Sequence, residues 1–527
     1  MRLGFALACA LPVITSGCSL IYNPNNIDKP DPDALQAIDA EIVVDANPAG
    51  LSIASVASPV IYEGQGVDGA ARAVVVVVGD NMEPDAKIQI VDHTTQLAVA
   101  SLTVADAETE VAGNHKMIAV PVTVALDAND SDIQLDVWVT QNVDGSPLTV
   151  KLANGADGAS PALILRGLPV VDGAAAVETI DTGAITGGAP AVFEKVYAKF
   201  NAKTLTVTGK NPLRIRSISS FALADKIDIS ATGLTMPGVG GNLGGGAGPT
   251  SGAAPNGAGP CGGPGGAAQT AGSVATAGAG GGLGTAGTGG TCTVADPNLS
   301  SLVKNLGGGG GGGGGTPGFL TLGAAMGGAG GASGGTIQID AGSTLTLTGG
   351  VTSNGVAGTG GGNSNAQAGG AGSGGAILLR ARGMLSAGTV VASGGVATAG
   401  SGRIRYDSAV PAATIAPTPA DAYRGPAIES LAEIIKTPLP TLKVYGAPGA
   451  PVKITIDGFQ NDGSSAHKNV PIELGDDGTN SVNLGAGQNL FRGVNTVCAV
   501  VDGVTAVPAP DEARDCVTVV YMFQNGQ

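Results

Sequence analysis

The feature that most constrains this chain is a repeat of short strands, each introduced by a glycine pair, between residues 334 and 406. Gly334-Gly335 precede Thr-Ile-Gln-Ile-Asp-Ala, and forty residues later Gly374-Gly375 precede Ala-Ile-Leu-Leu-Arg-Ala. A shortened copy ends at Tyr406. Alternating apolar and polar residues that recur behind a fixed glycine signal are typical of stacked strands in a solenoid.

Composition favours the same class. The 527 residues include 89 glycines and 31 prolines, whereas aromatic residues make up only 3%. A core must therefore be built from Val, Ile, Leu and Ala, which suits thin β layers better than a large enzyme core. We predict an all-β chain of several domains.

The solenoid is expected to begin before the repeat. Leu205-Thr-Val-Thr-Gly209 echoes Leu345-Thr-Leu-Thr-Gly349, and further alternating strands follow the first of these. We therefore predict a right-handed β-helix over residues 166–410, interrupted by a glycine-rich insertion at 236–335. The insertion contains nine consecutive glycines at 307–315. Because ordered glycine loses the most backbone freedom, a flexible excursion is the first expectation. Close-packed glycine strands that cover a solenoid face are the alternative.

Strand patterns separated by turn residues also flank the solenoid. Residues 50–165 and 439–527 each predict an antiparallel β-sandwich, joined to the solenoid on the C-terminal side by a Pro-rich linker at 411–438. The most apolar run, Val74 to Val78, has the length of a strand. Trp138, the only tryptophan, is expected to fill the core of the first sandwich.

The N-terminus predicts export. Residues 1–17 combine a positive start with a short apolar run, as in a signal peptide. Ser16-Gly17-Cys18 is similar to the end of a bacterial lipobox, which makes Cys18 the expected lipidation site; Thr15 departs from the usual leucine, and ordinary signal cleavage is the alternative. Residues 18–49 are expected to tether the folded units to the membrane.

Four further cysteines fit an exported protein. Cys261 and Cys292 bracket part of the insertion, and Cys498 and Cys516 lie close together near the C-terminus, so each pair predicts a disulfide. Each bridge is expected to stabilise the chain by roughly 3 kcal/mol. No CxxC motif or neighbouring histidine supports a metal site at either pair.

Charge and motifs exclude several functions. The net charge of −16 comes without basic patches, so nucleic acid is not an expected partner. His93, His115 and His467 are dispersed and are expected to be structural. No nucleophile elbow or P-loop is present. The acidic loops at 127–132 and 476–478, the second with Asp457 and Asp462, lack the full pattern of a calcium loop and are expected to be hydrogen-bonded turns. We therefore expect no catalytic residues, metal or cofactor.

A β-helix raises one enzymatic alternative, because polysaccharide lyases and hydrolases use that fold. The charged residues on or beside the predicted solenoid strands that could contact a glycan are Asp228, Asp340, Arg380, Arg382, Arg403 and Arg405. The same residues equally suit a solvated strand face. A threonine line, Thr344, Thr346 and Thr348, is best explained by ordinary β propensity.

Several of these features resemble a protein family. The segment from Pro59 through Glu63-Gly64 to Gly79-Asp80-Asn81 resembles the opening of immunoglobulin-like TIG modules, and Leu490 to Val500 resembles the late strands of such modules. With the lipobox-like start and tracts such as Ala371-Gly-Ser-Gly-Gly375-Ala-Ile-Leu-Leu-Arg380, the chain resembles myxobacterial-type glycine-rich surface lipoproteins. The resemblance implies a lipid-anchored protein of the outer membrane or cell surface.

The expected function is therefore a non-enzymatic surface lipoprotein with an adhesive or envelope-structural role. Its expected partners are the membrane, through the lipid on Cys18, and surface glycans or envelope proteins. The alternative is a β-helix protein that binds or degrades polysaccharide.

Overall fold

The computed structural model describes residues 50–57, 60–127, 130–152, 162–184, 191–249, 253–259, 261–270, 274–283, 285–290, 309–316, 326–362, 366–397, 399–410, 414–418, 422–459, 465–484, 488–501 and 513–522. Over these residues the chain is all-β, with one short 3-10 helix and no α-helix. No helix in the described ranges has the length and hydropathy needed to cross a membrane.

The N-terminal unit consists of two mainly antiparallel sheets around one apolar core. One sheet has the order β1-β3-β7-β5 with β6 beside β7, and the other the order β2-β10-β8-β4 with β9 beside β8. Their bounds are β1 (Ser52–Val56), β2 (Val60–Tyr62), β3 (Ala73–Asp80), β4 (Lys87–Asp92), β5 (Leu102–Val104), β6 (Glu110–Val111), β7 (Met117–Val124), β8 (Ile133–Val143), β9 (Ser146–Leu152) and β10 (Leu163–Arg166), with the 3-10 helix η1 at Asp106–Glu108.

Strand β3 explains the apolar run at Val74 to Val78. Val75 and Val77 face the core between the two sheets, whereas Val76 lies on the opposite face in a cluster with Val520 and Met522 of the C-terminal unit. Because both faces of the strand are covered, alternation of polar and apolar residues is lost, as in any strand buried on two sides.

Trp138 does not fill this core, which corrects the expectation from the sequence. On β8 the side chains of Leu135, Val137 and Val139 point inward, so the period of two places Trp138 on the outer face. There it is half-buried, and the ammonium group of Lys151 lies 4.0 Å from its ring centroid.

The middle unit stacks parallel strands turn upon turn. Three sheets contain only parallel pairs: β13-β16-β19-β22-β24-β26, β12-β15, and β11-β14-β17-β20-β23-β21-β18 with β25 beside β23. The bounds are β11 (Val170–Asp172), β12 (Val177–Asp181), β13 (Phe193–Tyr197), β14 (Lys199–Ala202), β15 (Thr204–Thr208), β16 (Leu213–Ser217), β17 (Phe221–Leu223), β18 (Ile227–Asp228), β19 (Thr336–Ala341), β20 (Leu345–Leu347), β21 (Val351–Thr352), β22 (Ala376–Ala381), β23 (Leu385–Val391), β24 (Arg403–Ser408), β25 (Thr414–Thr418) and β26 (Tyr423–Arg424).

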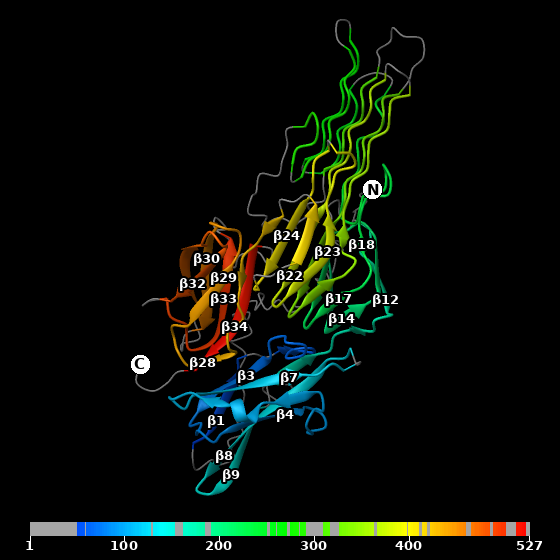
Figure 1. Cartoon of the computed structure of the whole chain (residues 1–527). Helices are drawn as coiled ribbons and strands as arrows, with labels where there is room; N and C mark the ends of the chain where they lie inside the picture. The colour runs from blue at the N-terminus through cyan, green and yellow to red at the C-terminus, as the bar shows by residue number, and fades with distance from the viewer. Residues whose placement is uncertain are drawn as a thin grey trace, which may run out of the picture.

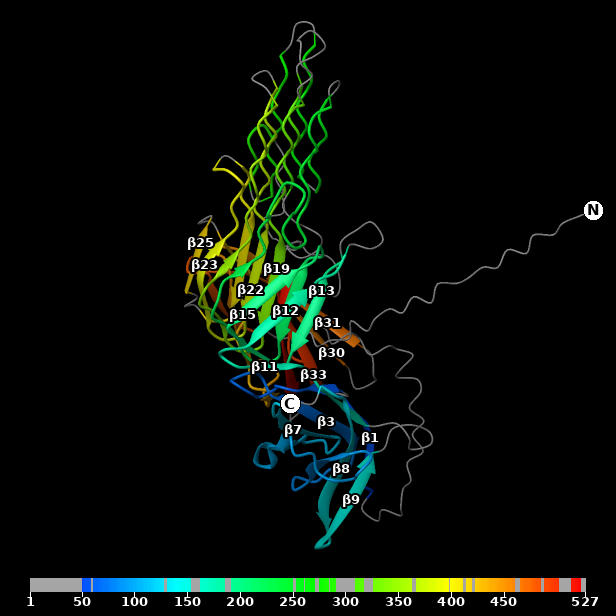
Figure 2. The same ribbon diagram turned by 90° about the vertical axis from the view of Figure 1, so that its right-hand side faces the viewer.

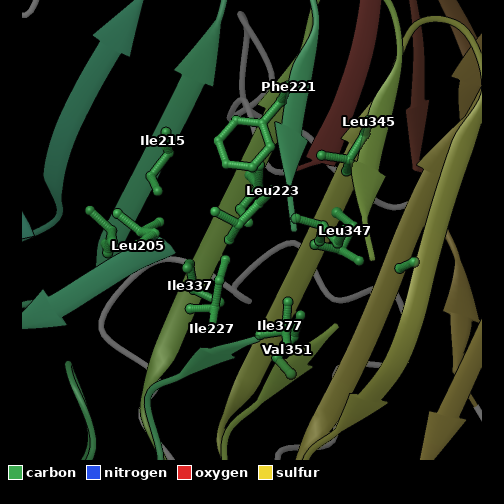
Figure 3. Close-up of a cluster of buried hydrophobic side chains, with 14 of the residues drawn as sticks. Leu205, Ile215, Phe221, Leu223, Ile227, Ile337, Leu345, Leu347, Val351 and Ile377 are labelled. Atoms are coloured by element: carbon green, nitrogen blue, oxygen red, sulfur yellow. The ribbon is translucent and has the colours of Figure 1, made fainter. Parts of the chain in front are cut away.

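The strands on either side of the glycine-rich insertion pair directly. Leu213 of β16 lies opposite Ile337 of β19, and Phe221 of β17 lies opposite Leu345 of β20. The side chains that alternate inward from these strands form one continuous core (Figure 3). Phe200 and Phe221 stack within it, with ring centroids 4.4 Å apart.

The C-terminal unit again has two sheets around its own core. Their orders are β27-β29-β32 and β28-β34-β33-β30-β31. The bounds are β27 (Ala427–Ile428), β28 (Ile434–Ile435), β29 (Thr441–Tyr445), β30 (Pro451–Phe459), β31 (Ser465–Glu473), β32 (Thr479–Asn483), β33 (Gly493–Val501) and β34 (Arg514–Tyr521). The segment expected to be a linker instead contributes β25 and β26 to the middle unit and β27 and β28 to the C-terminal unit.

The three units pack against one another (Figure 1). An apolar cluster around Tyr62, Leu168 and Ala198 joins the N-terminal unit to the middle unit. Arg72 of the N-terminal unit pairs with Glu433, whose carboxylate oxygen lies 3.2 Å from the guanidinium. From this base the glycine-rich segments extend away as one long projection, which both views show in green and yellow (Figures 1 and 2).

Candidate functional site: a glycine bundle and a buried ion-pair ladder

The projection is a bundle of extended segments packed around a core of glycine backbone. Its central segment is residues 309–316, all of them buried. Six ring segments surround it, and an eighth, outer segment, 355–361, lies outside the ring. We call these eight segments the glycine bundle; the ring segments, in order around the centre, are 242–249, 254–258, 263–269, 276–282, 366–374 and 327–335.

Hydrogen bonds of the central segment repeat every three residues. The backbone N–H groups of Gly309, Gly312 and Gly315 donate to the ring segment 276–282, and the lengths are 3.2, 2.8 and 2.9 Å. Gly310 and Gly313 donate to the segment 254–258, and Gly311 and Gly314 donate to the segment 327–335. Three residues per turn is the period of the polyproline II helix.

The carbonyl groups of the central segment point to the other three ring segments. Gly370 donates to the oxygen of Gly312, Gly263 to that of Gly310, and Gly245 to that of Gly311, at 2.8, 2.8 and 2.7 Å. Neighbouring ring segments are also bonded to one another, as from Ala279 to Pro264. The centre therefore has six hydrogen-bonded neighbours, which is hexagonal packing.

Only glycine fits the centre. A Cβ atom added at any residue from Gly309 to Gly315 would lie between 1.9 and 2.2 Å from a neighbouring carbonyl oxygen. None of these glycines has φ in the left-handed region, so close approach of backbones, and not an unusual dihedral angle, requires them. The expected flexible excursion is thus wrong for the described residues, and the alternative of close-packed glycine strands holds there. The segments project from the base instead of covering a strand face.

No residue of these eight segments carries an ionisable side chain, and Cys261, between two of them, is disulfide-bonded. The exposed positions are mostly glycine, alanine, threonine and proline. The charged groups of the described chain therefore lie on the base, and the projection is a neutral rod with short side chains.

The charged rung positions expected to face a glycan form a buried ladder instead. On the sheet that contains β16, β19, β22 and β24, the register aligns Arg216, Asp340, Arg380 and Asp407 in one column. The Nε atom of Arg380 lies 2.9 Å from Asp407, and a guanidinium nitrogen of Arg405 lies 2.6 Å from the same carboxylate. Arg405 is 0% exposed and Asp407 is 2% exposed.

The neighbouring charges fix the ionisation of the ladder. Burial by itself would raise the pKa of Asp340, but Arg214, Arg380 and Arg216 lower it below its ordinary value. Burial would likewise lower the pKa of Arg380, and the carboxylates of Asp407 and Asp340 raise it instead. Each charge in the column is compensated by another, so the ladder is a structural network.

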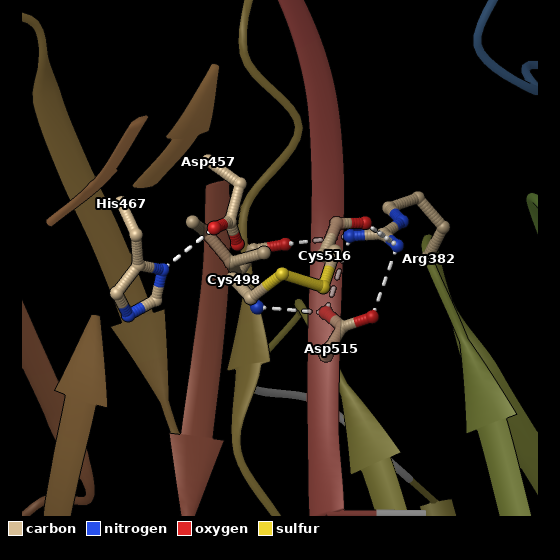
Figure 4. The surroundings of a disulfide bond; sticks show 7 residues. Arg382, Asp457, His467, Cys498, Asp515 and Cys516 are labelled. Atoms are coloured by element: carbon tan, nitrogen blue, oxygen red, sulfur yellow. Dashed lines mark hydrogen bonds and ion pairs between the residues drawn. A yellow bond between two sulfur atoms is a disulfide. The ribbon is translucent and has the colours of Figure 1, made fainter. Parts of the chain in front are cut away.

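The C-terminal unit closes over this face through Arg382. Its guanidinium forms two hydrogen bonds with the carboxylate of Asp515, at 2.9 and 3.1 Å, and also donates to the carbonyl groups of Ile428 and Cys516 (Figure 4). Of the other two positions, Asp228 pairs with Lys226 at 3.0 Å and half of its side chain is exposed, whereas Arg403 is part of β24. The structure thus brings together Asp340, Arg380 and Arg405, and buries the two arginines.

The threonine line does not stack. Thr346 lies between Ala222 of the strand below and Ser386 of the strand above, so threonine does not recur from turn to turn. The line is confined to one strand, as ordinary β propensity predicts.

The three histidines have local partners. His93 Nδ1 lies 2.7 Å from Asp136, His115 Nδ1 lies 2.8 Å from the carbonyl oxygen of Met82, and His467 Nδ1 lies 2.6 Å from Asp457. None of the three lies beside another histidine or a cysteine in these contacts.

The acidic loops are also engaged locally. The N–H of Asp127 donates to the buried carboxylate of Glu63, whose pKa is raised by burial, and Asp132 pairs with Arg166. Asp477 accepts from the backbone N–H of Thr479 at 2.9 Å. Asn129 and Asp462 lie outside the described residues. In the described ranges no group of three His, Cys, Asp or Glu side chains is placed to hold a metal ion.

One predicted disulfide is formed, between Cys498 and Cys516 on the neighbouring strands β33 and β34 (Figure 4). Cys261 is disulfide-bonded and buried, whereas its expected partner Cys292 lies outside the described residues. Cys18, the signal peptide and the tether lie outside them as well.

The hexagonal bundle is not among the features predicted from the sequence, although a signal for it is present. Runs such as Gly262-Gly-Pro-Gly-Gly-Ala267 carry a small residue at every position, so a period of three can close-pack without side chains. No family model matches the chain, and comparison with curated proteins and with solved structures finds no match either.

Proposed function

We propose that this chain is a non-enzymatic cell-surface lipoprotein that holds a rigid, neutral projection away from its membrane anchor, in an adhesive or envelope-structural role. In this proposal the middle unit is a right-handed β-helix, the flanking units are immunoglobulin-like sandwiches, and lipid on Cys18 anchors the base. The chain is then exported, with the projection displayed at the outer membrane or cell surface.

The observation that carries the proposal is the glycine bundle. A segment such as Gly309 to Gly315 loses much conformational entropy on ordering and buries no side chain. Its order is supported by hydrogen bonds to six neighbours. Such a rod suits spacing or contact, and the described residues of its eight segments carry no ionisable side chain.

The alternative of a polysaccharide-binding or polysaccharide-degrading β-helix loses its main support. Three of the residues offered for a glycan have partners within the chain: Arg380 and Arg405 pair with Asp407, and Asp340 accepts from Arg214. A glycan would have to displace Asp515 from Arg382 before it reached that face.

The anchor is tested by metabolic labelling with a fatty-acid analogue and by protease treatment of intact cells. We expect label on the wild-type chain and none on Cys18→Ala, and we expect cleavage of the wild-type chain without lysis. A chain found wholly in the cytosol would end the proposal.

The role of the projection is tested by attachment of cells to glass and to films of neutral and acidic polysaccharide. Cells that display Gly312→Val, which breaks the centre of the bundle, are compared with cells that display Gly360→Ala at the same surface level. Loss of attachment or of envelope integrity in the first variant alone is expected. Equal behaviour of both variants and the wild type in attachment and detergent resistance would contradict both roles.

A further inference from the structure

The outer segment of the bundle shows how the hexagonal packing grows by one chain. Residues 355–361 lie in the groove between the ring segments 327–335 and 366–374. Val356 and Thr359 donate to Ala332 and Ala329 of the first, both at 2.9 Å, and accept from Gly372 and Gly369 of the second, at 3.0 and 2.9 Å. A glycine-rich extended chain is thus bound by backbone hydrogen bonds alone.

Gly395 packs against the backbone of Val356 and Ala357, and beyond that contact several amides of the outer segment have no partner among the described residues. The backbone N–H groups of Ala357, Gly358, Gly360 and Gly361 have no hydrogen-bond partner within the described part of the chain. Such a row of free donors resembles the edge strand of a sheet, which pairs with another chain unless it is blocked.

Three prolines lie on the opposite side of the bundle. Pro249, Pro255 and Pro264 stand on three consecutive ring segments and offer no N–H group. The segments 276–282, 366–374, 327–335 and 355–361 contain no proline. Each proline removes one backbone donor from its own segment.

Gly360 marks the open side most clearly. A Cβ atom added there would meet nothing within 4 Å, and the residue has no left-handed φ. Gly69, Gly145, Gly183 and Gly449 also have open surroundings, but each of them has a positive φ. The fold of one chain does not require glycine at this position, whereas the close approach of a second backbone would.

We infer that the outer segments of two copies of this chain pair side by side about a two-fold axis. The partner must be an extended, uncharged segment with small side chains and free backbone carbonyl groups. The carbonyl groups of the outer segment at residues 357, 358, 360 and 361 accept no hydrogen bond within the described part of the chain, so the same segment of a second copy meets each requirement. A two-fold axis lets each segment donate to the other. Glycine and alanine side chains lose no rotamer freedom on pairing.

The pairing is weak and favoured by salt. One pair of segments buries less than the roughly 1,200 Å² of a stable specific interface. The two bases, in a chain of net charge −16, repel each other until salt screens them. This association extends beyond the proposed surface role and does not depend on the anchor.

Sedimentation velocity on the full chain tests the pairing, with Cys18→Ser in every sample to keep lipid out of the measurement. We expect a monomer that dimerises as concentration and salt rise. Gly360→Glu, which places like charges opposite each other, should weaken dimerisation about tenfold or more. Ala267→Glu adds the same charge at an exposed site on the proline-bearing side and should dimerise as the wild type does.

Amide hydrogen exchange supplies the second readout. The N–H groups of Ala357, Gly358, Gly360 and Gly361 should gain protection as the dimer forms, and unchanged melting curves should show that both glutamate variants fold. A chain that stays monomeric in high salt overturns the inference. A dimer that Gly360→Glu leaves intact also overturns it, because the contact would then lie on another face. So does association that occurs only with a different glycine-rich protein.

Discussion

The backbone N–H of Gly312 donates to the carbonyl oxygen of Ala279 at 2.8 Å, although 33 residues separate the two along the chain. This bond is one of the contacts that make the central segment the axis of the bundle. It places the Cα of Gly312 so close to a third segment that a Cβ would lie 2.0 Å from the oxygen of Pro264.

Replacing Gly312 should therefore loosen the whole bundle. We expect Gly312→Ala to cost about 1–3 kcal/mol, as for other overpacked sites, because backbone atoms cannot move aside as a side chain would. Limited proteolysis and chemical unfolding measure the loss. Gly360→Ala, in open space, should be neutral or stabilise by about 0.4–1 kcal/mol. Equal protease resistance of the two variants would contradict the hexagonal packing.

The pair Arg382–Asp515 should control the docking of the C-terminal unit. Both side chains are mostly buried, so Arg382→Ala leaves a buried carboxylate without its cation and should cost about 3–5 kcal/mol. Calorimetry should show the C-terminal unit unfolding at a lower temperature. As a control, Lys226→Ala breaks an exposed ion pair with Asp228 within the middle unit and should cost less than about 1 kcal/mol. A larger effect in the control would refute the assignment.

The contact between the N- and C-terminal units should weaken in acid. Burial opposes ionisation of Glu433, but its hydrogen bonds with Arg72 prevail and lower its pKa. A lowered folded pKa means that the stabilisation is complete above the ordinary glutamate pKa of about 4.3 and is lost as pH falls through the folded value.

Denaturation at pH values on both sides of this range checks the sign. The difference in free energy of unfolding between wild type and Glu433→Gln should be at most about 1 kcal/mol above pH 5, and should shrink toward pH 3. Glu108 shares Arg72, and its pKa is also lowered by hydrogen bonding to that residue, so Glu108→Gln should shift the curve in the same direction. A difference in the free energy of unfolding that grew as the pH fell would contradict the lowered pKa of Glu433.

The Cys498–Cys516 disulfide should stabilise the C-terminal unit by about 3 kcal/mol, because it closes a loop with a sequence separation of 18 in the unfolded chain. Unfolding of the double variant Cys498→Ser/Cys516→Ser, compared with the wild type, measures this contribution. Reductant should lower the stability of the C-terminal unit in the wild type and leave the stability of that unit unchanged in the double variant. Insensitivity of the wild type after full reduction would count against a stabilising role.

Much of the strand content could be predicted from residue patterns. The repeat from Gly334 and the echo at Leu205 place Ile337 and Leu345 on inward faces, and both belong to the core of the middle unit. Trp138 was misplaced because its size suggested burial, whereas the alternation of its neighbours on β8 already pointed it outward.

By itself, the sequence determined the all-β class, the inward alternation of the stacked strands and the cysteine pair that forms between β33 and β34, because these depend on local periodicity and on short separations. Tertiary structure decided the rest. A glycine segment has no side chain whose size or polarity predicts what it packs against, so only the assembled bundle shows the six hydrogen-bonded neighbours of residues 309–316. Likewise, the sequence pattern around Arg380 and Arg405 suggests a solvated face, whereas the folded chain buries both arginines beside Asp407.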